Sequence, residues 1–117
     1  MIINSEQIAI ETAKALEAKK ADNIRIFDVR GQSTVTDFYV VATGTSAPHL
    51  KALISETQHH LKSMGVSSFR KSGEPDSGWI VIDYVYAVAH VFSPEAREYY
   101  AIENLWATAK ELPFPRP

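Results

Sequence analysis

The stretch GWIVIDYVYAVAHVFSPEAREYYAIENLW, residues 78–106, decides the fold that the sequence predicts. It opens with an apolar, β-branched run over 79–82, of the kind that forms buried strands. A second apolar run follows, and residues 93–95, Ser-Pro-Glu, are typical of a helix start. Asp83 and His90 interrupt the two runs, and a buried strand rarely carries such residues without a partner or a function.

The segments on either side of this stretch complete an alternation of helices and strands. Apolar residues recur at helical spacing in three segments, which are residues 5–20, residues 48–64 and the residues from 94 onward, through Ile102, Leu105, Trp106 and Ala109. Strand character appears in residues 24–29, 36–43, 66–70, 79–84 and 87–92. The second of these strands is apolar on both faces, so we expect it at the centre of the sheet. Residues 71–78 are dense in turn residues and predict an exposed loop.

These elements predict one α/β domain over residues 1–112, with a single mixed β-sheet of roughly five strands and helices packed against it. Residues 113–117 are rich in proline and predict a loose C-terminal tail. Val85-Tyr86 contains no turn residue, yet one unbroken strand from 79 to 92 would be unusually long. We therefore expect a break near residues 84–87.

The composition narrows the possible chemistry. The chain has no cysteine, which excludes disulfides, thiolate metal sites and thiol catalysis. The net charge is −2 and the sequence shows no basic patch, so DNA is not an expected partner, while the sequence leaves direct contact with ribosomal RNA open. The N-terminal segment contains Glu6 and Glu11 and lacks the apolar core of a signal peptide. No apolar run is long enough for a membrane helix, so we expect a soluble, cytoplasmic protein without membrane contact.

Catalytic motifs find little support. Residues 44–46, Gly-Thr-Ser, lie between a strand and a helix, where an anion could bind, but they lack the glycine spacing of nucleotide-binding loops. No two of the four histidines have the i, i+4 spacing of a helical metal site, and no carboxylate pair stands on a strand. We expect no catalytic residue, no metal, no cofactor and no small-molecule substrate.

The aromatic residues of the opening stretch favour an interaction module over an enzyme. Trp79 and Asp83 share one face of their strand, and Ile80 and Tyr84 share the other. A strand with an acid on one face and a tyrosine hydroxyl on the other is not purely buried. Tyrosine, tryptophan and arginine are enriched at protein interfaces.

The chain resembles the ribosomal silencing factor family, also called the Iojap family, over nearly its whole length. One block of resemblance is TDFYVVATGTS, residues 36–46, followed by His49 and Lys51 at the expected places. The second block comprises, in order and at the expected spacing, Gly78, Trp79, Asp83, Tyr84, His90, Val91, Phe92, Glu95, Arg97, Tyr100, Glu103, Leu105 and Trp106. The family usually has Gly-Asp where this chain has Val85-Tyr86, so the hairpin must close differently or contain a bulge.

The resemblance implies a function. Family members bind the large ribosomal subunit through ribosomal protein L14, on the face where the small subunit docks. They block subunit joining and lower translation when nutrients are scarce. Organelle relatives act in large-subunit assembly, and members are often homodimers. The fold implied is nucleotidyltransferase-like without the catalytic acids. The alternative is a nucleotidyltransferase-type enzyme that uses residues 44–46 for phosphate and Asp83 for a metal.

We expect the partner-binding site on the exposed part of the sheet over 79–92 and on the adjoining start of the third helix. Trp79 and Tyr84 are the expected aromatic anchors. Asp83, Glu95 and Glu103 are acids that would complement a basic ribosomal protein. Arg97 would be a polar rim or an internal tie to either acid. The strand histidine would contact the partner, or else be a buried, hydrogen-bonded residue that fixes the hairpin. The expected site residues are Trp79, Asp83, Tyr84, His90, Glu95, Arg97 and Tyr100.

Overall fold

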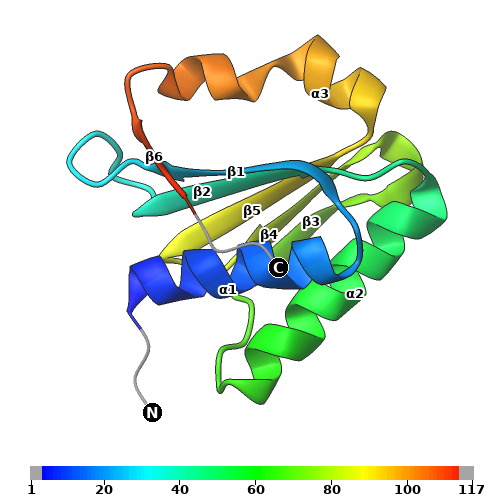
Figure 1. Ribbon diagram of the computed structural model, residues 1–117, viewed down its shortest axis with the longest axis horizontal. Coiled ribbons are helices and arrows are strands. Elements are labelled where there is room, and N and C mark those ends of the chain that lie inside the picture. Colours follow the sequence, from blue (N-terminus) through cyan, green and yellow to red (C-terminus); the bar gives the residue numbers. More distant parts are fainter. Residues whose placement is uncertain (1–3, 114–117) are drawn as a thin grey trace.

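A computed structural model describes residues 4–113 as a six-stranded mixed sheet with helices on both faces (Figure 1). The helices are α1 (Ser5–Ala18), α2 (Ala47–Ser63) and α3 (Pro94–Tyr100), with 3₁₀ segments η1 (Pro75–Ser77) and η2 (Ile102–Trp106). The strands are β1 (Asp22–Asp28), β2 (Phe38–Thr43), β3 (Arg70–Glu74), β4 (Trp79–Asp83), β5 (Ala87–Phe92) and β6 (Lys110–Leu112). The spatial order is β3-β4-β5-β2-β1-β6. The α/β class and the single mixed sheet are confirmed, with six strands in place of about five.

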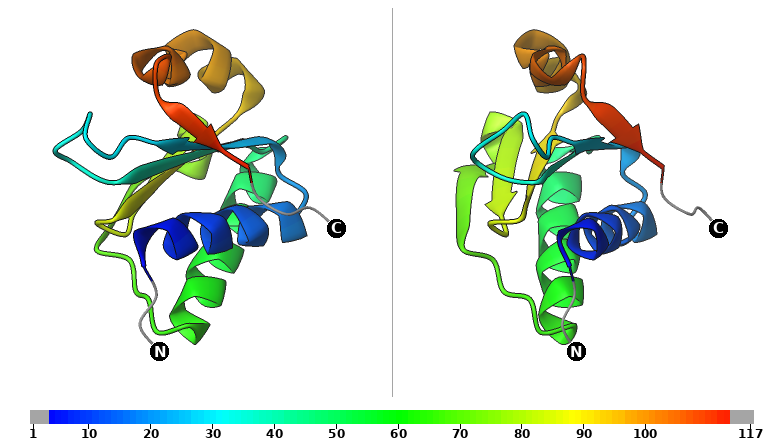
Figure 2. Two further views of the ribbon diagram at one scale, coloured as in Figure 1. Left: turned by 60° about the vertical axis from the view of Figure 1, so that its left-hand side comes forward. Right: turned by 90° about the vertical axis from the view of Figure 1, so that its left-hand side faces the viewer.

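Helices α1 and α2 cover one face of the sheet, and α3 with η2 covers the other (Figures 1 and 2). A capping box begins α1, because the Asn4 side chain accepts a hydrogen bond from the Gln7 backbone N–H and the Gln7 side chain accepts one from Asn4. The apolar stripe expected on α2 is buried at Leu50, Leu53, Ile54, Thr57 and Leu61. These side chains and the stripe of α1 form the main core against the sheet.

Strand β2 lies at the centre of the sheet, as its two apolar faces predict. It pairs in parallel with β5 and antiparallel with β1. Phe38, Val40 and Ala42 belong to the core under α1 and α2, whereas Tyr39 and Val41 belong to a second core under α3. The parallel pairing places residues of the opening stretch directly beside the middle of the domain.

Two sequence expectations between α2 and β4 are wrong. The strand expected over 66–70 begins only at Arg70, and it takes in residues 71–74, which the sequence assigned to an exposed loop. All five β3 side chains are exposed, so this edge strand has no apolar alternation and is held by backbone pairing with β4. Gly73 permits that pairing, because its φ is +93° and a Cβ there would lie 2.2 Å from the Trp79 carbonyl oxygen.

The C-terminal part of the domain also differs from expectation. The sequence predicts one helix running through Ala109, but the helix ends at Ala101, which has a φ of +46°. Ile102, Trp106 and Ala109 still pack on the sheet, whereas Leu105 is 78% exposed. Strand β6 follows and pairs with β1, and its three residues are too few to give a sequence pattern. The tail expected over 113–117 lies, apart from residue 113, outside the described residues.

The hairpin between β4 and β5 closes without glycine and without a bulge. The register runs continuously from the Trp79–Phe92 pair to the Asp83–Val88 pair. Val85 has a φ of +73°, the Tyr86 N–H donates to the Tyr84 carbonyl at 2.8 Å, and the Asp83 carboxylate accepts from the Val85 N–H at 2.7 Å. A β-branched residue at positive φ is strained, and the Asp83 hydrogen bond offsets part of that strain.

We predict that Val85→Gly stabilises the protein, because glycine adopts this backbone conformation without steric cost. The free energy of unfolding should rise by about 1 kcal/mol, which is the relief of strain less the added entropy of the unfolded chain. Urea denaturation of the variant and the parent measures it. Tyr86→Gly is the matched control, since residue 86 has no positive φ and should gain nothing. A lower stability for Val85→Gly would contradict the strain.

Candidate binding face

The sheet face opposite α1 and α2, called here the α3 face, carries most of the unusual residues of the opening stretch. Cross-strand pairing places Trp79 opposite Phe92 and Val81 opposite His90, so these four side chains lie on this face. Trp79 stacks on Phe92 with ring centroids 5.0 Å apart. Its indole N–H donates to Nδ1 of His90 at 3.1 Å.

His90 is a neutral acceptor in this arrangement. Burial lowers its pKa to about 4, so the ring carries no charge at neutral pH. Because Nδ1 accepts the indole hydrogen, the ring proton lies on Nε2. His90 therefore orients Trp79, which agrees with the second of its two expected roles. A direct contact with a partner stays a prediction.

The His90 environment predicts a loss of stability in mild acid. Its pKa is about 4 in the folded protein and has the ordinary value of 6.5 in the unfolded chain, so the unfolded chain binds more protons between these values. The free energy of unfolding should therefore fall by about 2 kcal/mol between about pH 7.5 and pH 5. Urea titrations at several pH values measure this. In the His90→Asn variant, the new amide oxygen can accept the hydrogen bond from the Trp79 indole. The loss of stability between about pH 7.5 and pH 5 should therefore be smaller. His59→Asn on α2 controls for removing a histidine, and equal pH dependence in both variants would contradict the assignment.

The α3–η2 layer covers only part of the α3 face. Trp106 stacks on Tyr39 with centroids 4.0 Å apart and planes within 11°, and Tyr100 packs on Trp79 at 4.6 Å. Beside Tyr100 a shallow hollow of 310 Å³ remains, with Trp79 and Val81 in its wall and Ser72, Gly73 and Ser77 at its edge. This lining, called here the apolar hollow, is the open part of the face.

Exposed aromatic and acidic side chains lie on the same elements as the lining of the apolar hollow, α3 and β4. Tyr99 is 82% exposed, Tyr100 is 49% exposed, and their rings meet edge to face at 5.0 Å. Glu95 lies one helical turn before Tyr99 and is exposed, while Asp83 lies two residues beyond Val81 on the same face of β4 and is half-buried. The arrangement offers a recess with aromatic rims and nearby negative charge.

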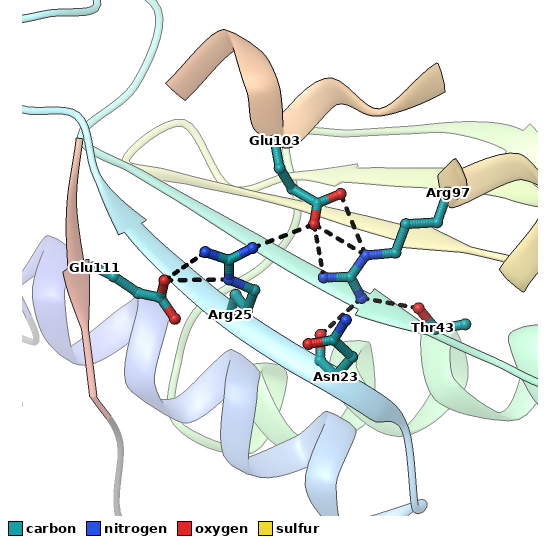
Figure 3. Close-up of polar contacts among 6 residues, drawn as sticks. All are labelled: Asn23, Arg25, Thr43, Arg97, Glu103 and Glu111. Atoms are coloured by element: carbon teal, nitrogen blue, oxygen red, sulfur yellow. Dashed lines mark hydrogen bonds and ion pairs between the residues drawn. The ribbon is translucent and has the colours of Figure 1, made fainter. Parts of the chain in front are cut away.

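A buried ion-pair network fastens the α3–η2 layer to the sheet (Figure 3). Arg97, only 8% exposed, donates from Nε and Nη2 to the Glu103 carboxylate at 3.1–3.3 Å. Its Nη1 donates to the Asn23 carbonyl at 2.7 Å and to the Thr43 hydroxyl at 2.8 Å. Arg25 extends the network, since it lies 3.6 Å from Glu103 and 2.7 Å from Glu111 on β6. Five elements, α3, η2, β1, β2 and β6, thus meet through the Arg97 guanidinium and its neighbours.

The structure separates the expected site residues into two groups. Trp79, Asp83, His90, Glu95 and Tyr100 all lie on the α3 face or on α3 itself. The expectations for Tyr84 and for Arg97 need correction. Tyr84 is 4% exposed on the opposite, helix-covered face, so it is not an exposed anchor, and its buried hydroxyl has no hydrogen-bond partner within residues 4–113. Burial raises the pKa of Tyr84 to about 12.

Arg97 is an internal tie, but to Glu103 and not to Asp83 or Glu95. Asp83 instead binds the Val85 N–H. Sequence reasoning also missed Tyr99 as an exposed residue, although the adjacent pair Tyr99-Tyr100 on a short helix was a signal, because neighbouring positions cannot both face the sheet.

The turn over 44–46 is occupied by its own hydrogen bonds. The Thr45 N–H donates to Nδ1 of His49 at 2.9 Å, and the Ser46 hydroxyl accepts from the His49 N–H at 3.1 Å. The other ring nitrogen of His49 reaches the Lys19 carbonyl at 2.7 Å. His49 thereby joins the start of α2 to the end of α1. These contacts are those of a turn and of the N-cap of α2.

The described part of the chain has neither a cluster of metal ligands nor a helix that could cross a membrane. Within residues 4–113, no three His, Cys, Asp or Glu side chains are close enough to hold a metal ion together. None of the described helices is long and apolar enough to cross a membrane.

The fold and this face define an α/β domain that presents an aromatic recess with acidic neighbours on one side of its sheet. The family model described as "Ribosomal silencing factor during starvation" matches residues 2–116, and the chain belongs to that family. The ribosomal silencing factor of Haemophilus influenzae is 36% identical over 94 residues, which cover 80% of this chain and 92% of that protein.

A solved structure and an organelle relative extend the comparison. A crystal structure of a Chromobacterium violaceum protein superposes with a TM-score of 0.86 at 30% identity, and covers 98% of this chain and 95% of that one. The mouse protein named mitochondrial assembly of ribosomal large subunit protein 1 is 31% identical over 94 residues, 78% of this chain and 41% of that protein. The family is ribosome-associated and is not a known family of enzymes.

Proposed function

We propose that this protein binds the large ribosomal subunit through ribosomal protein L14 and thereby blocks joining of the small subunit when nutrients are scarce. Membership of the ribosomal silencing factor family supports the silencing role. The observation that carries the choice of a protein partner is the apolar hollow with its tyrosine rim, because recessed aromatic sites are typical centres of protein interfaces.

Charge supports the same partner. Glu95 is exposed and Asp83 is half-buried beside the apolar hollow, and ribosomal proteins are generally basic. Complementary charges speed association and select the partner more than they raise affinity. An apolar or basic side chain of the partner would fill the hollow between Trp79 and Tyr100, and the acids would steer its approach.

Cosedimentation with purified large subunits tests the proposal. The folded protein should pellet with large subunits, and adding it before small subunits should reduce the yield of joined ribosomes in a sucrose gradient. It should also bind purified L14 in the absence of RNA. A folded protein that stays in the supernatant at low salt would refute the proposal.

A role in large-subunit assembly is the second candidate, because a relative that carries assembly in its name is similar over most of this chain. Deletion in the cell separates the two. Immature large-subunit precursors would indicate assembly, whereas mature subunits with unrestrained joining during starvation would indicate silencing.

Two further features belong to the proposal. The free protein forms a homodimer, as the family resemblance implies, and it acts in the cytoplasm, where ribosomes are. Light scattering on the purified chain measures its mass, and a monomer across the working concentration range would rule out the dimer.

The nucleotidyltransferase alternative has no observation in its favour. The Thr45 N–H and the Ser46 hydroxyl are already engaged with His49, and Asp83 is engaged with the Val85 N–H. Calorimetry with nucleotide and Mg²⁺ tests it. Saturable micromolar binding that is lost in Asp83→Asn would make it the better assignment.

A further inference from the structure

A groove lined by cations runs between α2 and the chain segment that returns to β3. Lys51, Ser55, Gln58 and Lys62 fall on one side of α2, at i, i+4, i+7 and i+11. They line two hollows of 330 and 340 Å³ that share Gln58, and Lys71 of β3 lines the first. Figure 2 shows the returning segment running back beside α2. We call this surface the basic groove.

The charges in the basic groove are available for a ligand. Lys51, Lys62 and Lys71 are exposed, and within residues 4–113 none of them forms an ion pair. Glu74 lies at one end of the first hollow, while Glu56 lies on another side of α2. The net charge of −2 concealed this patch, so the expectation that no basic patch exists is corrected by the fold.

Polar donors and one exposed aromatic residue complete the groove. Ser67 and Ser68 line the second hollow beside Lys62, and the Gln58 amide reaches the Ser68 hydroxyl at 3.4 Å. Phe69 follows and is 67% exposed, although its backbone N–H is fixed to the Asp83 carbonyl at 2.8 Å. The Arg70 guanidinium lies 5.5 Å from the Phe69 ring centroid. Phe69 lines neither hollow but adjoins Ser68 in sequence, and an exposed ring beside a cation is a platform on which an unpaired base can stack.

We propose that the basic groove binds the phosphodiester backbone of single-stranded RNA, with one unpaired base stacked on Phe69. Lys51, Lys62 and Lys71 would each neutralise a phosphate of the same strand, and the serine hydroxyls would donate to phosphate oxygens. The choice of RNA rests on the proposed function, because a protein on the large subunit is surrounded by ribosomal RNA.

The position of the groove supports two simultaneous contacts. Gly73 lines both the basic groove and the apolar hollow, so β3 is the ridge that separates them. A ribosomal protein in the apolar hollow would leave the basic groove facing the neighbouring surface. A lipid bilayer fits less well, because the lysines line a recess with hydroxyl donors and, within residues 4–113, Phe69 is the one exposed aromatic ring that accompanies them.

Fluorescence anisotropy with a labelled single-stranded RNA of about 12 nucleotides tests the groove on the isolated protein. Binding should saturate at low salt. The logarithm of the binding constant should fall as the logarithm of the salt concentration rises, with a slope of about −2 for three lysines. Lys62→Ala/Lys71→Ala should reduce the slope to about −0.7. Phe69→Ala should weaken binding about fivefold or more while leaving the slope unchanged.

Lys14→Ala/Lys110→Ala is the matched control, because it removes the same charge from exposed positions on α1 and β6. It should leave RNA binding close to that of the parent. Absence of saturable binding, equal losses in both double variants, or stronger binding to phosphatidylserine vesicles than to RNA would each overturn the groove assignment. Binding to purified L14 should survive Lys62→Ala/Lys71→Ala, so failure of the groove and failure of the proposed function give different results.

Discussion

Arg97→Ala is expected to lower the free energy of unfolding by about 3 kcal/mol or more, the cost typical of removing one partner from a buried ion pair. The side chain is 8% exposed, and its removal leaves the Glu103 carboxylate without its fork of donors. The Asn23 carbonyl and the Thr43 hydroxyl also lose their hydrogen bonds. The α3–η2 layer should loosen first, because no other side chain joins it to both β1 and β2 through hydrogen bonds within the described residues.

Urea denaturation followed by circular dichroism and tryptophan fluorescence measures this loss. Trp106 belongs to this layer and stacks on Tyr39, and Trp79 packs against Tyr100 of α3, so the tryptophan emission should shift at lower urea than the helical signal. Arg97→Lys should recover little of the stability lost in Arg97→Ala, since an ammonium group cannot reproduce the planar fork of donors. Arg25→Ala is the comparison within the same network, because Arg25 is 38% exposed and its loss should cost below about 1 kcal/mol. Equal costs for the two arginines would contradict a structural role for Arg97.

Tyr99→Ala is expected to weaken binding to large subunits, and to purified L14, by about 30-fold, the effect typical of losing an aromatic hot-spot contact. The side chain is 82% exposed and its ring contacts only Tyr100 among the described aromatic residues, so its removal should leave the stability within about 0.5 kcal/mol of the parent. Quantitative cosedimentation over a range of subunit concentrations measures the affinity.

Tyr86→Ala is the matched control for that experiment. Tyr86 is 59% exposed at the hairpin, at the opposite end of β5 from α3. Its replacement should leave the affinity nearly unchanged. Glu95→Lys on α3 should slow association and reduce its sensitivity to salt. If Tyr99→Ala and Glu95→Lys both bind like the parent, the face beside the apolar hollow is not the contact.

The sequence predicts most of the fold because most of its elements bury an apolar face. The stripe on α2 and the two-faced apolar run of β2 have no other stable arrangement, and both were found as expected. The strands β3 and β6 were missed or misplaced because they are exposed edge strands, and backbone pairing leaves no mark on the side-chain pattern. Helix α3 ends early because Ala101 turns left-handed, which nothing in the apolar spacing signals.

The candidate site was predictable only in part. Alternation along β4 correctly separated Trp79 from Tyr84, but it does not reveal which face lies under α1 and α2. Arg97 has the composition of an interface residue, yet its partners Asn23 and Thr43 are 74 and 54 residues away in sequence, so its burial emerges only from the fold. The basic groove could not be predicted for the same reason. Its lysines come from α2 and β3, and no pattern in the sequence indicates that these two elements lie side by side.

Strand β6 has a consequence for how the chain is made. It is synthesised after every other described element, and until it pairs, the outer edge of β1 has no partner. An open strand edge on a nascent chain invites pairing with another chain. The three residues of β6, fastened by the Arg25–Glu111 ion pair, therefore cover a strand edge that would otherwise be open to such pairing.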